Sequence, residues 1–268
     1  MQNVVLITGA STGIGKSIGE YLAKFNYKVY GTSRNPKHKE LNGIHFLQLD
    51  VTELQSVDTA IDTLISKEGQ LDFLINNAGV GITGPLEEIP EVEQKKIFET
   101  NYFGPLRVIN AVLPHMRSRN SGFIINVTSI AGHMGLPFRG FYSATKGALE
   151  LTTEAYRMEL KAFGIKMTNV APGDFATNIA SGRYHAPIQE NSPYKEVYQK
   201  SLKLMDEHVD HGKDPNLMAE SVHAIMQKSN PKIHYKVGDL TQRMSVFLKH
   251  ILPDRLFERL LLKHYKLK

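Results

Sequence analysis

The chain opens with a short apolar run that passes directly into a glycine-rich segment. Val4 to Ile7 is mostly β-branched, which predicts a buried strand, and Thr8-Gly9-Ala10-Ser11-Thr12-Gly13-Ile14-Gly15 follows it. An amphipathic stretch from Ile18 to Phe25 comes next. Glycines let a backbone turn tightly beside a pyrophosphate, and the N-terminus of the following helix presents free N–H groups to it. The pattern therefore predicts a dinucleotide-binding turn, although its G-x-x-x-G-x-G spacing differs from the usual G-x-G-x-x-G.

Strand-like and helix-like segments alternate along the whole chain, which is typical of a doubly wound α/β fold. We expect a Rossmann-type, seven-stranded parallel sheet with strands at 4–7, 28–32, 44–49, 71–75, 123–127, 165–171 and 233–237. Flanking helices are expected near 15–25, 53–67, 91–118, 142–163 and 215–228. No linker divides the chain, so residues 1–268 are expected to form one domain.

The end of the second expected strand bears on the choice of cofactor. An acidic residue at this point usually holds the ribose 2′-hydroxyl of NAD, and none occurs between Val29 and Lys37. Arg34 is suited to grip a 2′-phosphate instead. A solvated basic turn is the other interpretation of the same residues. We expect NADP(H) to be preferred over NAD(H).

Polar residues follow the third and fourth expected strands. Asp50 and Val51 suit the edge of an adenine ring, although Asp50 is equally suited to be the N-cap of the next helix. Asn77, Ala78 and Gly79 suit close backbone packing across a strand end, or a tight turn. We place all five in the cofactor site.

Tyr142 and Lys146 are four residues apart and share one face of a helix. A phenol with a reference pKa of about 10 is a poor proton shuttle at neutral pH, and a neighbouring ammonium group favours the phenolate. The pair is thus a candidate acid/base device. Ser129 follows the fifth expected strand, where a hydroxyl reaches the ligand crevice of an open α/β sheet, or caps a turn. His133 is expected to be a solvated loop residue.

Together these pieces resemble the short-chain dehydrogenase/reductase family. The similarity runs in the family's order from Thr8 to Thr177 and is jointly very specific. Its parts are Thr8 to Gly15, Asn76 to Gly79, Asn101, Ser129, Tyr142 to Lys146, Pro172-Gly173 and Thr177.

The resemblance implies four catalytic residues. Tyr142 would be the general acid in carbonyl reduction, and Lys146 would hold the nicotinamide ribose and favour the phenolate. Ser129 would hydrogen-bond the substrate oxygen. Asn101 would position a water behind Lys146, and as a modest helix former it suits a local kink.

The resemblance also completes the cofactor site, in which Thr177 and the backbone after Pro172-Gly173 would bind the nicotinamide carboxamide. The implied set is Gly9, Ser11, Thr12, Gly13, Ile14, Gly15, Arg34, Asp50, Val51, Asn77, Ala78, Gly79, Tyr142, Lys146, Pro172, Gly173 and Thr177.

The activity that the resemblance implies is NADP(H)-dependent interconversion of a carbonyl and a secondary alcohol. Residues 176–215 are expected to form a polar, irregular lid whose apolar side chains either line a pocket or pack the lid down. Because of this long lid and the basic tail, the resemblance is to the steroid- and retinoid-type dehydrogenases, which implies a steroid-, retinoid- or lipid-like substrate. The alternatives are a 3-oxoacyl-carrier-type reductase and, in another class, a cofactor-gated binding or regulatory protein.

The last residues, 254–268, are predicted to form a basic amphipathic helix. Such a helix packs on its own protein, on a partner subunit or on an anionic membrane surface. We expect it to pack against protein and to border the substrate entrance, and peripheral membrane contact remains the alternative.

Composition bounds the remaining possibilities. With no cysteine among 268 residues, disulfides and thiolate metal sites are excluded, and no metal is expected. The net charge of +5 comes without a base-stacking aromatic motif, so no nucleic-acid partner is expected. The first strand begins within a few residues of Met1 and no long apolar run appears, so we expect neither a signal peptide nor a spanning helix, and a cytoplasmic location. The family resemblance implies a homodimer or homotetramer, in which the long helices following residues 91 and 142 pair with their counterparts in another subunit.

Overall fold

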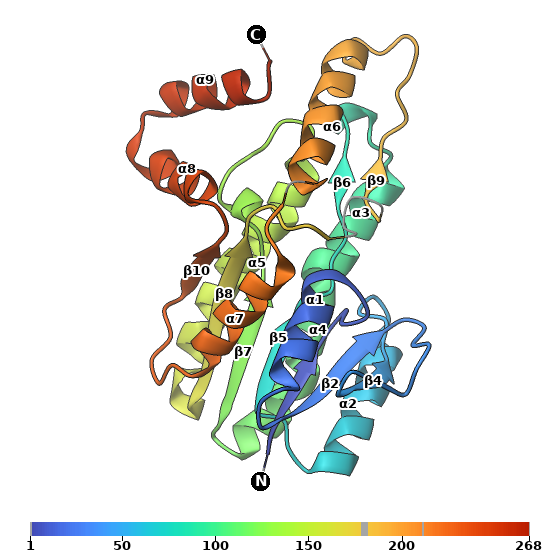
Figure 1. The fold of residues 1–268 in the computed structure, drawn as a ribbon, viewed down its shortest axis with the longest axis vertical. Coiled ribbons are helices and arrows are strands. Elements are labelled where there is room, and N and C mark those ends of the chain that lie inside the picture. The colour runs from blue at the N-terminus through green and yellow to red at the C-terminus, as the bar shows by residue number, and fades with distance from the viewer. Residues whose placement is uncertain (1, 178–181, 211, 268) are drawn as a thin grey trace.

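The computed structural model describes residues 2–177, 182–210 and 212–267. Its centre is one sheet with the strand order β10-β8-β7-β5-β1-β2-β4-β3 (Figure 1). The seven expected parallel strands are confirmed as β1 (Asn3–Ile7), β2 (Tyr27–Ser33), β4 (Ile44–Gln48), β5 (Phe73–Asn76), β7 (Gly122–Val127), β8 (Ile165–Pro172) and β10 (His234–Val237).

An eighth strand, β3 (Glu40–Leu41), was not expected and pairs antiparallel with β4 at the sheet edge. The turn between them is Asn42-Gly43, and both residues have positive φ, at 52° and 78°. Asn-Gly is the preferred pair for a two-residue hairpin turn, so the sequence did carry a signal for this hairpin.

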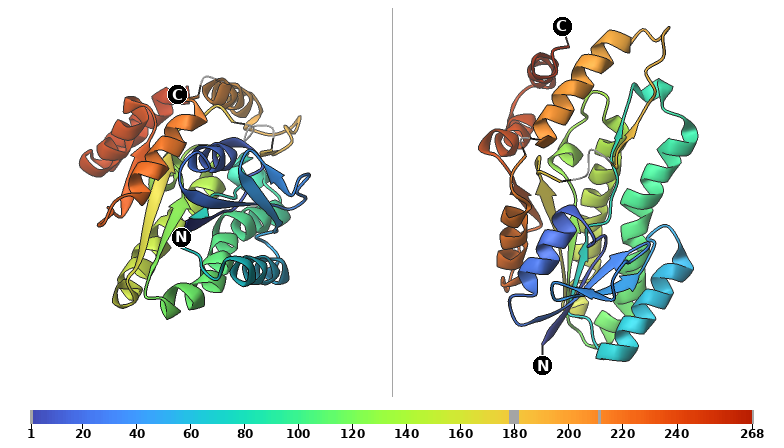
Figure 2. Two further views of the ribbon diagram at one scale, coloured as in Figure 1. Left: turned by 60° about the horizontal axis from the view of Figure 1, so that its bottom comes forward. Right: turned by 45° about the vertical axis from the view of Figure 1, so that its right-hand side comes forward.

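Helices cover both faces of the sheet (Figures 1 and 2). On one face α1 (Gly13–Leu22) packs against α7 (Pro215–Met226), and both contribute to one apolar cluster with the strands. On the other face lie α2 (Leu54–Glu68), α4 (Gly104–Ser118) and α5 (Gly140–Glu159). Along β1, Val5 and Ile7 point into the apolar cluster on the α1 and α7 side. Val4 and Leu6 point into a second apolar cluster on the side of α2, α4 and α5. Burial on both faces explains why this strand is apolar without alternation.

The long helix expected at 91–118 is interrupted. It consists of α3 (Glu91–Phe98), a π-helical turn at Glu99–Phe103 and α4. A π-helical turn places one extra residue in the helix and turns the following residues inward. Asn101 lies within it, so the local irregularity expected there is confirmed.

The expectation of an irregular lid at 176–215 is wrong in one part. Within it, α6 (Lys195–Asp210) is a regular helix, and β9 (Tyr184–His185) pairs with β6 (Ile82–Thr83) in a small second sheet. Tyr198, Ser201 and Met205 are buried at helical spacing, and the flanking prolines obscured this pattern in the sequence.

Beyond β10 the chain forms two helices, α8 (Leu240–Ile251) and α9 (Asp254–His264). The second confirms the expected C-terminal helix, and the first was missed. Short 3₁₀ turns lie at Leu86–Glu88, Ile130–His133 and Lys161–Phe163. None of the described helices has the length and apolar character needed to cross a bilayer.

Candidate active site

A cleft of about 430 Å³ lies at the carboxyl ends of the central strands. The strand order reverses between β1 and β5, and ligands of open α/β sheets bind at such a switch point. Most of the predicted cofactor residues line this cleft: Gly9, Ser11, Thr12, Gly13, Ile14, Arg34, Asp50, Val51, Asn77, Ala78, Gly79, Tyr142, Lys146, Pro172 and Thr177.

The glycine-rich turn forms the floor of the cleft. Gly9 and Gly13 have φ of +66° and +57°, which side-chain-bearing residues rarely adopt. A Cβ at Gly15 would lie 2.4 Å from Asn77 Nδ2, so Gly15 serves close packing and does not itself line the cleft. Thr12 precedes α1 without a side-chain capping bond, which leaves the first N–H groups of the helix available to an anion.

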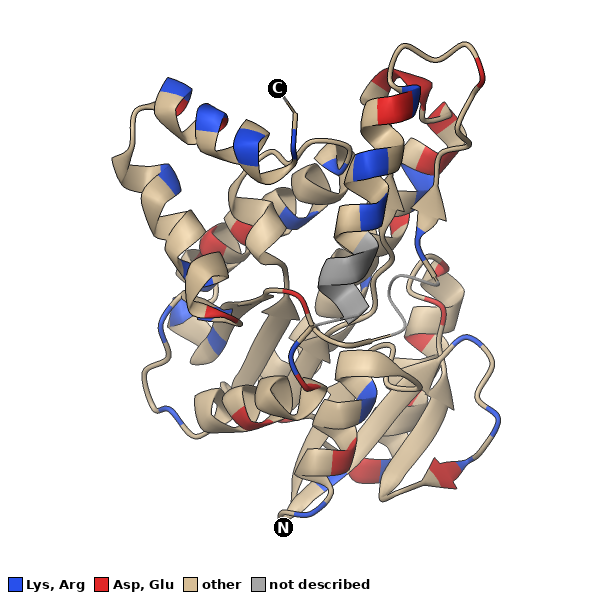
Figure 3. Cartoon of the chain, turned by 45° about the horizontal axis from the view of Figure 1, so that its top comes forward, with Lys and Arg blue, Asp and Glu red and all other residues tan. Residues whose placement is uncertain are grey.

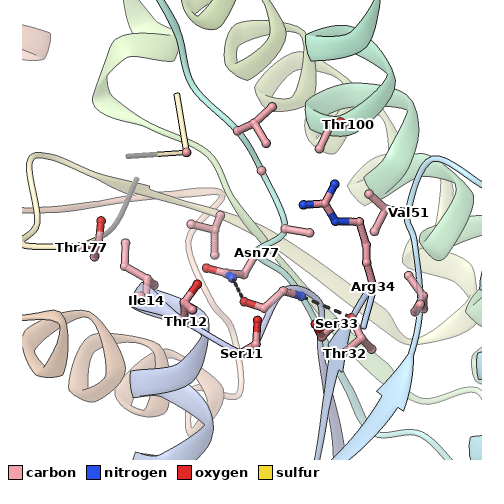
Figure 4. A pocket seen from close by; sticks show the side chains of 18 of the residues that line it. Ser11, Thr12, Ile14, Thr32, Ser33, Arg34, Val51, Asn77, Thr100 and Thr177 are labelled. Atoms are coloured by element: carbon pink, nitrogen blue, oxygen red, sulfur yellow. Dashed lines mark hydrogen bonds between the residues drawn. The ribbon is translucent and has the colours of Figure 1, made fainter. Parts of the chain in front are cut away.

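Hydrogen bonds from Asn77, directly after β5, connect the glycine-rich turn to the end of that strand (Figure 4). Its Nδ2 donates to the carbonyls of Thr8 and Gly9, at 3.0 and 3.1 Å. In return, Thr8 Oγ1 accepts from the backbone N–H groups of Asn77 and Ala78 at 3.0 Å. The two strand ends are thus held at one fixed separation.

Arg34 points across the cleft toward Thr100 (Figure 4) and is exposed to solvent. Asp50 also lines the cleft, but its Oδ1 accepts from the backbone N–H and hydroxyl of Thr52, at 2.9 and 2.8 Å. The N-cap of α2 is Glu53, so the alternative of Asp50 as the N-cap is wrong. The oxygen of Asp50 that does not bond Thr52, Oδ2, is therefore the one left to contact an adenine ring.

A smaller cavity of about 70 Å³ opens beside the cleft. It is lined by Ser129, whose Oγ also accepts from the N–H of Ala131 at 3.2 Å, and by Gly173. Tyr142 lines both cavities, so its phenol stands where they meet.

Lys146 lies one helical turn after Tyr142 and is fully buried. Its Nζ donates to the carbonyl of Val127 at 3.0 Å. Desolvation lowers the pKa of Lys146 to about 8, while the charge of Glu150 raises it. The group therefore titrates close to physiological pH, and its ammonium form depends on nearby negative charge.

Asn101 is fully buried and does not line either of these two cavities. Its Oδ1 accepts from the N–H of Val80 and its Nδ2 donates to the carbonyl of Val80, both at 2.9 Å. A Cβ at Gly79 would lie 3.2 Å from Asn101 Oδ1 and 3.4 Å from Lys146 Nζ. The two side chains therefore converge on Gly79, and a larger residue there would crowd both.

Sequence reasoning missed a charged cluster behind Lys146. Glu150 is buried, accepts a hydrogen bond from Thr128 Oγ1 at 2.5 Å, and lies 2.7 Å from His234 Nδ1. His234 Nε2 lies 3.0 Å from Glu154, a carboxylate 42% exposed. The hydrogen bond to Glu150 raises the pKa of His234, against the effect of burial. The recurrence of ionisable residues at 142, 146, 150 and 154 was the available signal.

The expectation that His133 is solvated is wrong. Its side chain is 13% exposed, and its Nε2 lies 3.7 Å from Glu150 Oε1, beyond hydrogen-bonding range. Burial lowers the pKa of His133, although the charge of Glu150 acts in the opposite direction. The loop therefore packs onto α5 and β10 rather than facing solvent.

Three charged residues of the smaller cavity were not predicted as site residues. They are Arg139, Asp174 and Arg183. The Arg139 guanidinium lies 5.5 Å from the centre of the Tyr142 ring. Asp174 accepts from Gln242 Nε2 at 2.7 Å, which ties the cavity wall to α8.

Apolar residues in and next to the expected lid were candidates for the pocket wall. Phe175 lines the smaller cavity and also joins the apolar cluster on the α1 and α7 side of the sheet, whereas Met205 is buried on α6 and lines neither cavity. Ile179 lies outside the described residues. Among the described residues, no group of three or more His, Asp or Glu side chains is placed to hold a metal ion.

Comparison with known proteins identifies the family of the chain and its similar relatives. Residues 3–187 match the short chain dehydrogenase family. A protein from Bacteroides thetaiotaomicron named 3-ketodihydrosphingosine reductase is 40% identical over 256 residues, which are 95% of each chain. A short-chain dehydrogenase from Streptomyces avermitilis superposes with a TM-score of 0.82 at 29% identity, covering 98% of this chain and 97% of the other.

Among the similar solved structures, some contain NADP and others contain NAD. A short-chain dehydrogenase from Burkholderia cenocepacia in complex with NADP has a TM-score of 0.75 at 25% identity, covering 97% and 99% of the two chains. One from Burkholderia phymatum in complex with NAD has a TM-score of 0.81 at 23% identity, covering 93% of each, and shows the fold alone.

Proposed function

The chain belongs to the short-chain dehydrogenases, and on this basis we propose that it is an NADP(H)-dependent reductase of a long-chain, lipid-like ketone. The observation that carries this proposal is the position of Tyr142, which lines both the cleft at the glycine-rich turn and the smaller cavity. A proton donor that borders both cavities would protonate the oxygen of a carbonyl held in the smaller cavity, next to a nicotinamide in the cleft.

The cleft fits the cofactor in three respects. Gly9 and Gly13 take the positive φ values that the turn needs at the floor of the cleft, and the open start of α1 suits a pyrophosphate. Arg34 stands at the end of β2, where a 2′-phosphate would lie, and the same strand end lacks an acidic residue. Exposed guanidinium groups bind phosphates bidentately, which supports NADP(H) over NAD(H).

The chain's own residues then provide the acid/base chemistry. A nicotinamide held in the cleft would supply the hydride for the carbonyl carbon. Tyr142 donates its proton to the carbonyl oxygen, and the Ser129 hydroxyl hydrogen-bonds the same oxygen as negative charge develops there. Lys146, held by the Val127 carbonyl, stabilises the resulting phenolate until it is reprotonated. The route by which the phenolate is reprotonated would start at Lys146, beside which Asn101 is held by Val80.

The substrate class comes from the relative at 40% identity, whose name indicates a long-chain ketone with an amino alcohol head. Among the described residues that line the smaller cavity, Asp174 is the carboxylate that would pair with an ammonium group, beside the guanidinium groups of Arg139 and Arg183. Apolar side chains pack around Tyr142, among them Ile82, Leu136 and Tyr184. They suit the alkyl part of such a substrate.

The test is NADPH oxidation by the purified protein with four ketones. These are 3-ketodihydrosphingosine, its analogue without the amine, a steroid ketone and a 3-oxoacyl thioester. We expect the highest kcat/KM for 3-ketodihydrosphingosine. Asp174→Asn should raise KM for the amine-bearing ketone and leave KM for the deaminated analogue nearly unchanged.

Faster turnover of the thioester than of any long-chain ketone would support the acyl-carrier alternative and overturn the proposed substrate class. No oxidation with any ketone, alongside tight NADPH binding, would favour a cofactor-gated binding protein.

A further inference from the structure

The outer side of α8 and α9 carries an exposed apolar stripe. On α8, Leu240, Met244, Phe247 and Ile251 are 69, 40, 52 and 56% exposed, and their spacing of four, three and four residues puts them on one side of the helix. On α9, Leu256 and Leu260 are 43 and 44% exposed and one turn apart. We call these six residues the tail stripe.

The opposite sides of the same helices are packed on the protein. Val246 and Phe257 are 0 and 4% exposed and join a cluster with Ile130 and Met134. Lys249 pairs with Asp254 at 2.9 Å across the junction between the helices. Because the buried sides of α8 and α9 pack into the same apolar cluster, both helices are anchored to the protein and the tail stripe faces outward.

Basic side chains flank the tail stripe. Arg243 lies beside it on α8, and Arg255, Arg259 and Lys263 lie beside it on α9, all exposed. Figure 3 shows Lys and Arg along the helix that leads to the C-terminus. Residues 240–267 hold six Lys or Arg side chains against two acidic ones, an excess of four positive charges in a chain whose net charge is +5.

The charge decides which partner fits this surface. Two copies of the chain meeting through it would bring two positive surfaces together, which opposes association. An anionic bilayer neutralises the same charges and takes the apolar side chains into its headgroup region. We propose that the tail stripe and its basic flank dock on an anionic phospholipid surface.

This surface adjoins the smaller cavity. Gln242 on α8 holds Asp174 of the cavity wall through two hydrogen bonds, at 2.7 and 3.2 Å. After α9, Tyr265 is 6% exposed, and burial raises its pKa while Arg139 of the same cavity acts in the opposite direction. Docking would therefore place the helix that holds the cavity wall next to the bilayer, which would serve a long-chain substrate if the proposed function holds.

The test is co-sedimentation with vesicles, without cofactor or substrate, so that its outcome is independent of the proposed reaction. Vesicles contain phosphatidylcholine alone or phosphatidylcholine with phosphatidylglycerol. We expect the wild-type protein to pellet with the anionic vesicles at least about tenfold more than with the neutral ones, and less at high salt.

Two double variants separate the two parts of the surface. Phe247→Ser with Ile251→Ser removes apolar contact, and Arg255→Gln with Arg259→Gln removes charge. Each should reduce pelleting about tenfold or more with an unchanged melting temperature, since all four side chains are exposed. The matched control is Leu54→Ser, a 59% exposed leucine at the start of α2, distant from the tail (Figure 1).

Wild-type protein that stays in solution with anionic vesicles would overturn the proposal. So would pelleting that survives both double variants, or that Leu54→Ser reduces equally. If light scattering shows that Phe247→Ser with Ile251→Ser splits an oligomer, the stripe is a subunit interface instead.

Discussion

At the scale of residues, the site is organised by one face of α5. Tyr142, Lys146, Glu150 and Glu154 recur every four residues, so the proton donor, its charged neighbour and two carboxylates follow one another along the helix. The first two could be predicted because a phenol and an ammonium at this spacing form a recognisable acid/base pair. Glu150 was missed although it continues the same spacing, because its partner His234 is distant in sequence and is brought beside it by β10.

Glu150 sets the pH range in which Lys146 remains charged. Burial lowers the pKa of Lys146 to about 8 and the charge of Glu150 raises it, so losing that charge lowers it further. Activity that needs the ammonium form falls as pH rises through this pKa. We therefore expect Glu150→Gln to move the basic limb of the pH profile of kcat/KM to lower pH.

Glu154→Gln is the matched control, because that carboxylate is partly solvated and should shift the limb less. A basic limb at the same pH in Glu150→Gln and in the wild-type enzyme would contradict this account of Lys146.

Arg34 is the residue on which the cofactor preference depends. A charge-assisted contact with a 2′-phosphate contributes about 1.5–3 kcal/mol, and the exposure of Arg34 favours the lower end. Arg34→Ala should weaken NADPH binding about tenfold and leave NADH binding nearly unchanged in fluorescence titrations. Lys37→Ala, a neighbouring exposed cation, serves as the control. Equal losses for both cofactors would show that Arg34 is ordinary surface.

At the scale of elements, the sequence predicted the sheet better than the segments that close over it. The central strands β1, β5 and β7 carry apolar residues on both faces and were found from their short apolar runs. In contrast, α6 lies between prolines, and α8 presents its apolar residues outward, so neither pattern indicated a packed helix. The interruption at Asn101 was foreseen only as a kink, because a π-helical turn depends on tertiary packing.

The C-terminal helix α9 is expected to stabilise the fold and to support the smaller cavity. Phe257 and Tyr265 are buried, and Tyr265 interacts with Arg139 of the smaller cavity. Deletion of residues 254–268 should lower the melting temperature and raise KM for long-chain ketones, with the NADPH dissociation constant nearly unchanged. Kinetics and melting temperature like those of the full chain would contradict the expected contact between tail and cavity.

At the scale of the whole molecule, α5 exposes apolar side chains in addition to the tail stripe. The outer side of α5 exposes Leu151 and Met158, at 68 and 72%, on the helix that the family resemblance implies in subunit pairing. Exposed patches of this kind mark contact sites on soluble proteins. The basic surface of α8 and α9 is suited to a bilayer, so the two surfaces need not compete.

We expect the chain to form a dimer or tetramer through α4 and α5. Leu151→Arg with Met158→Arg would place four cations at each two-fold contact and should release monomers, as measured by light scattering at micromolar concentration. Leu54→Ser again provides the control. A wild-type protein that is already monomeric, or an oligomer that withstands the double substitution, would refute this interface.

The central claim is that Tyr142 is the proton donor beside a bound nicotinamide. The most direct measurement compares the wild type with Tyr142→Phe in two assays, NADPH oxidation with the best ketone and NADPH binding by fluorescence. We predict that the loss of one oxygen reduces kcat at least about a hundredfold, as expected for a general acid, while the dissociation constant stays within about twofold. Turnover within about tenfold of wild type would contradict the account.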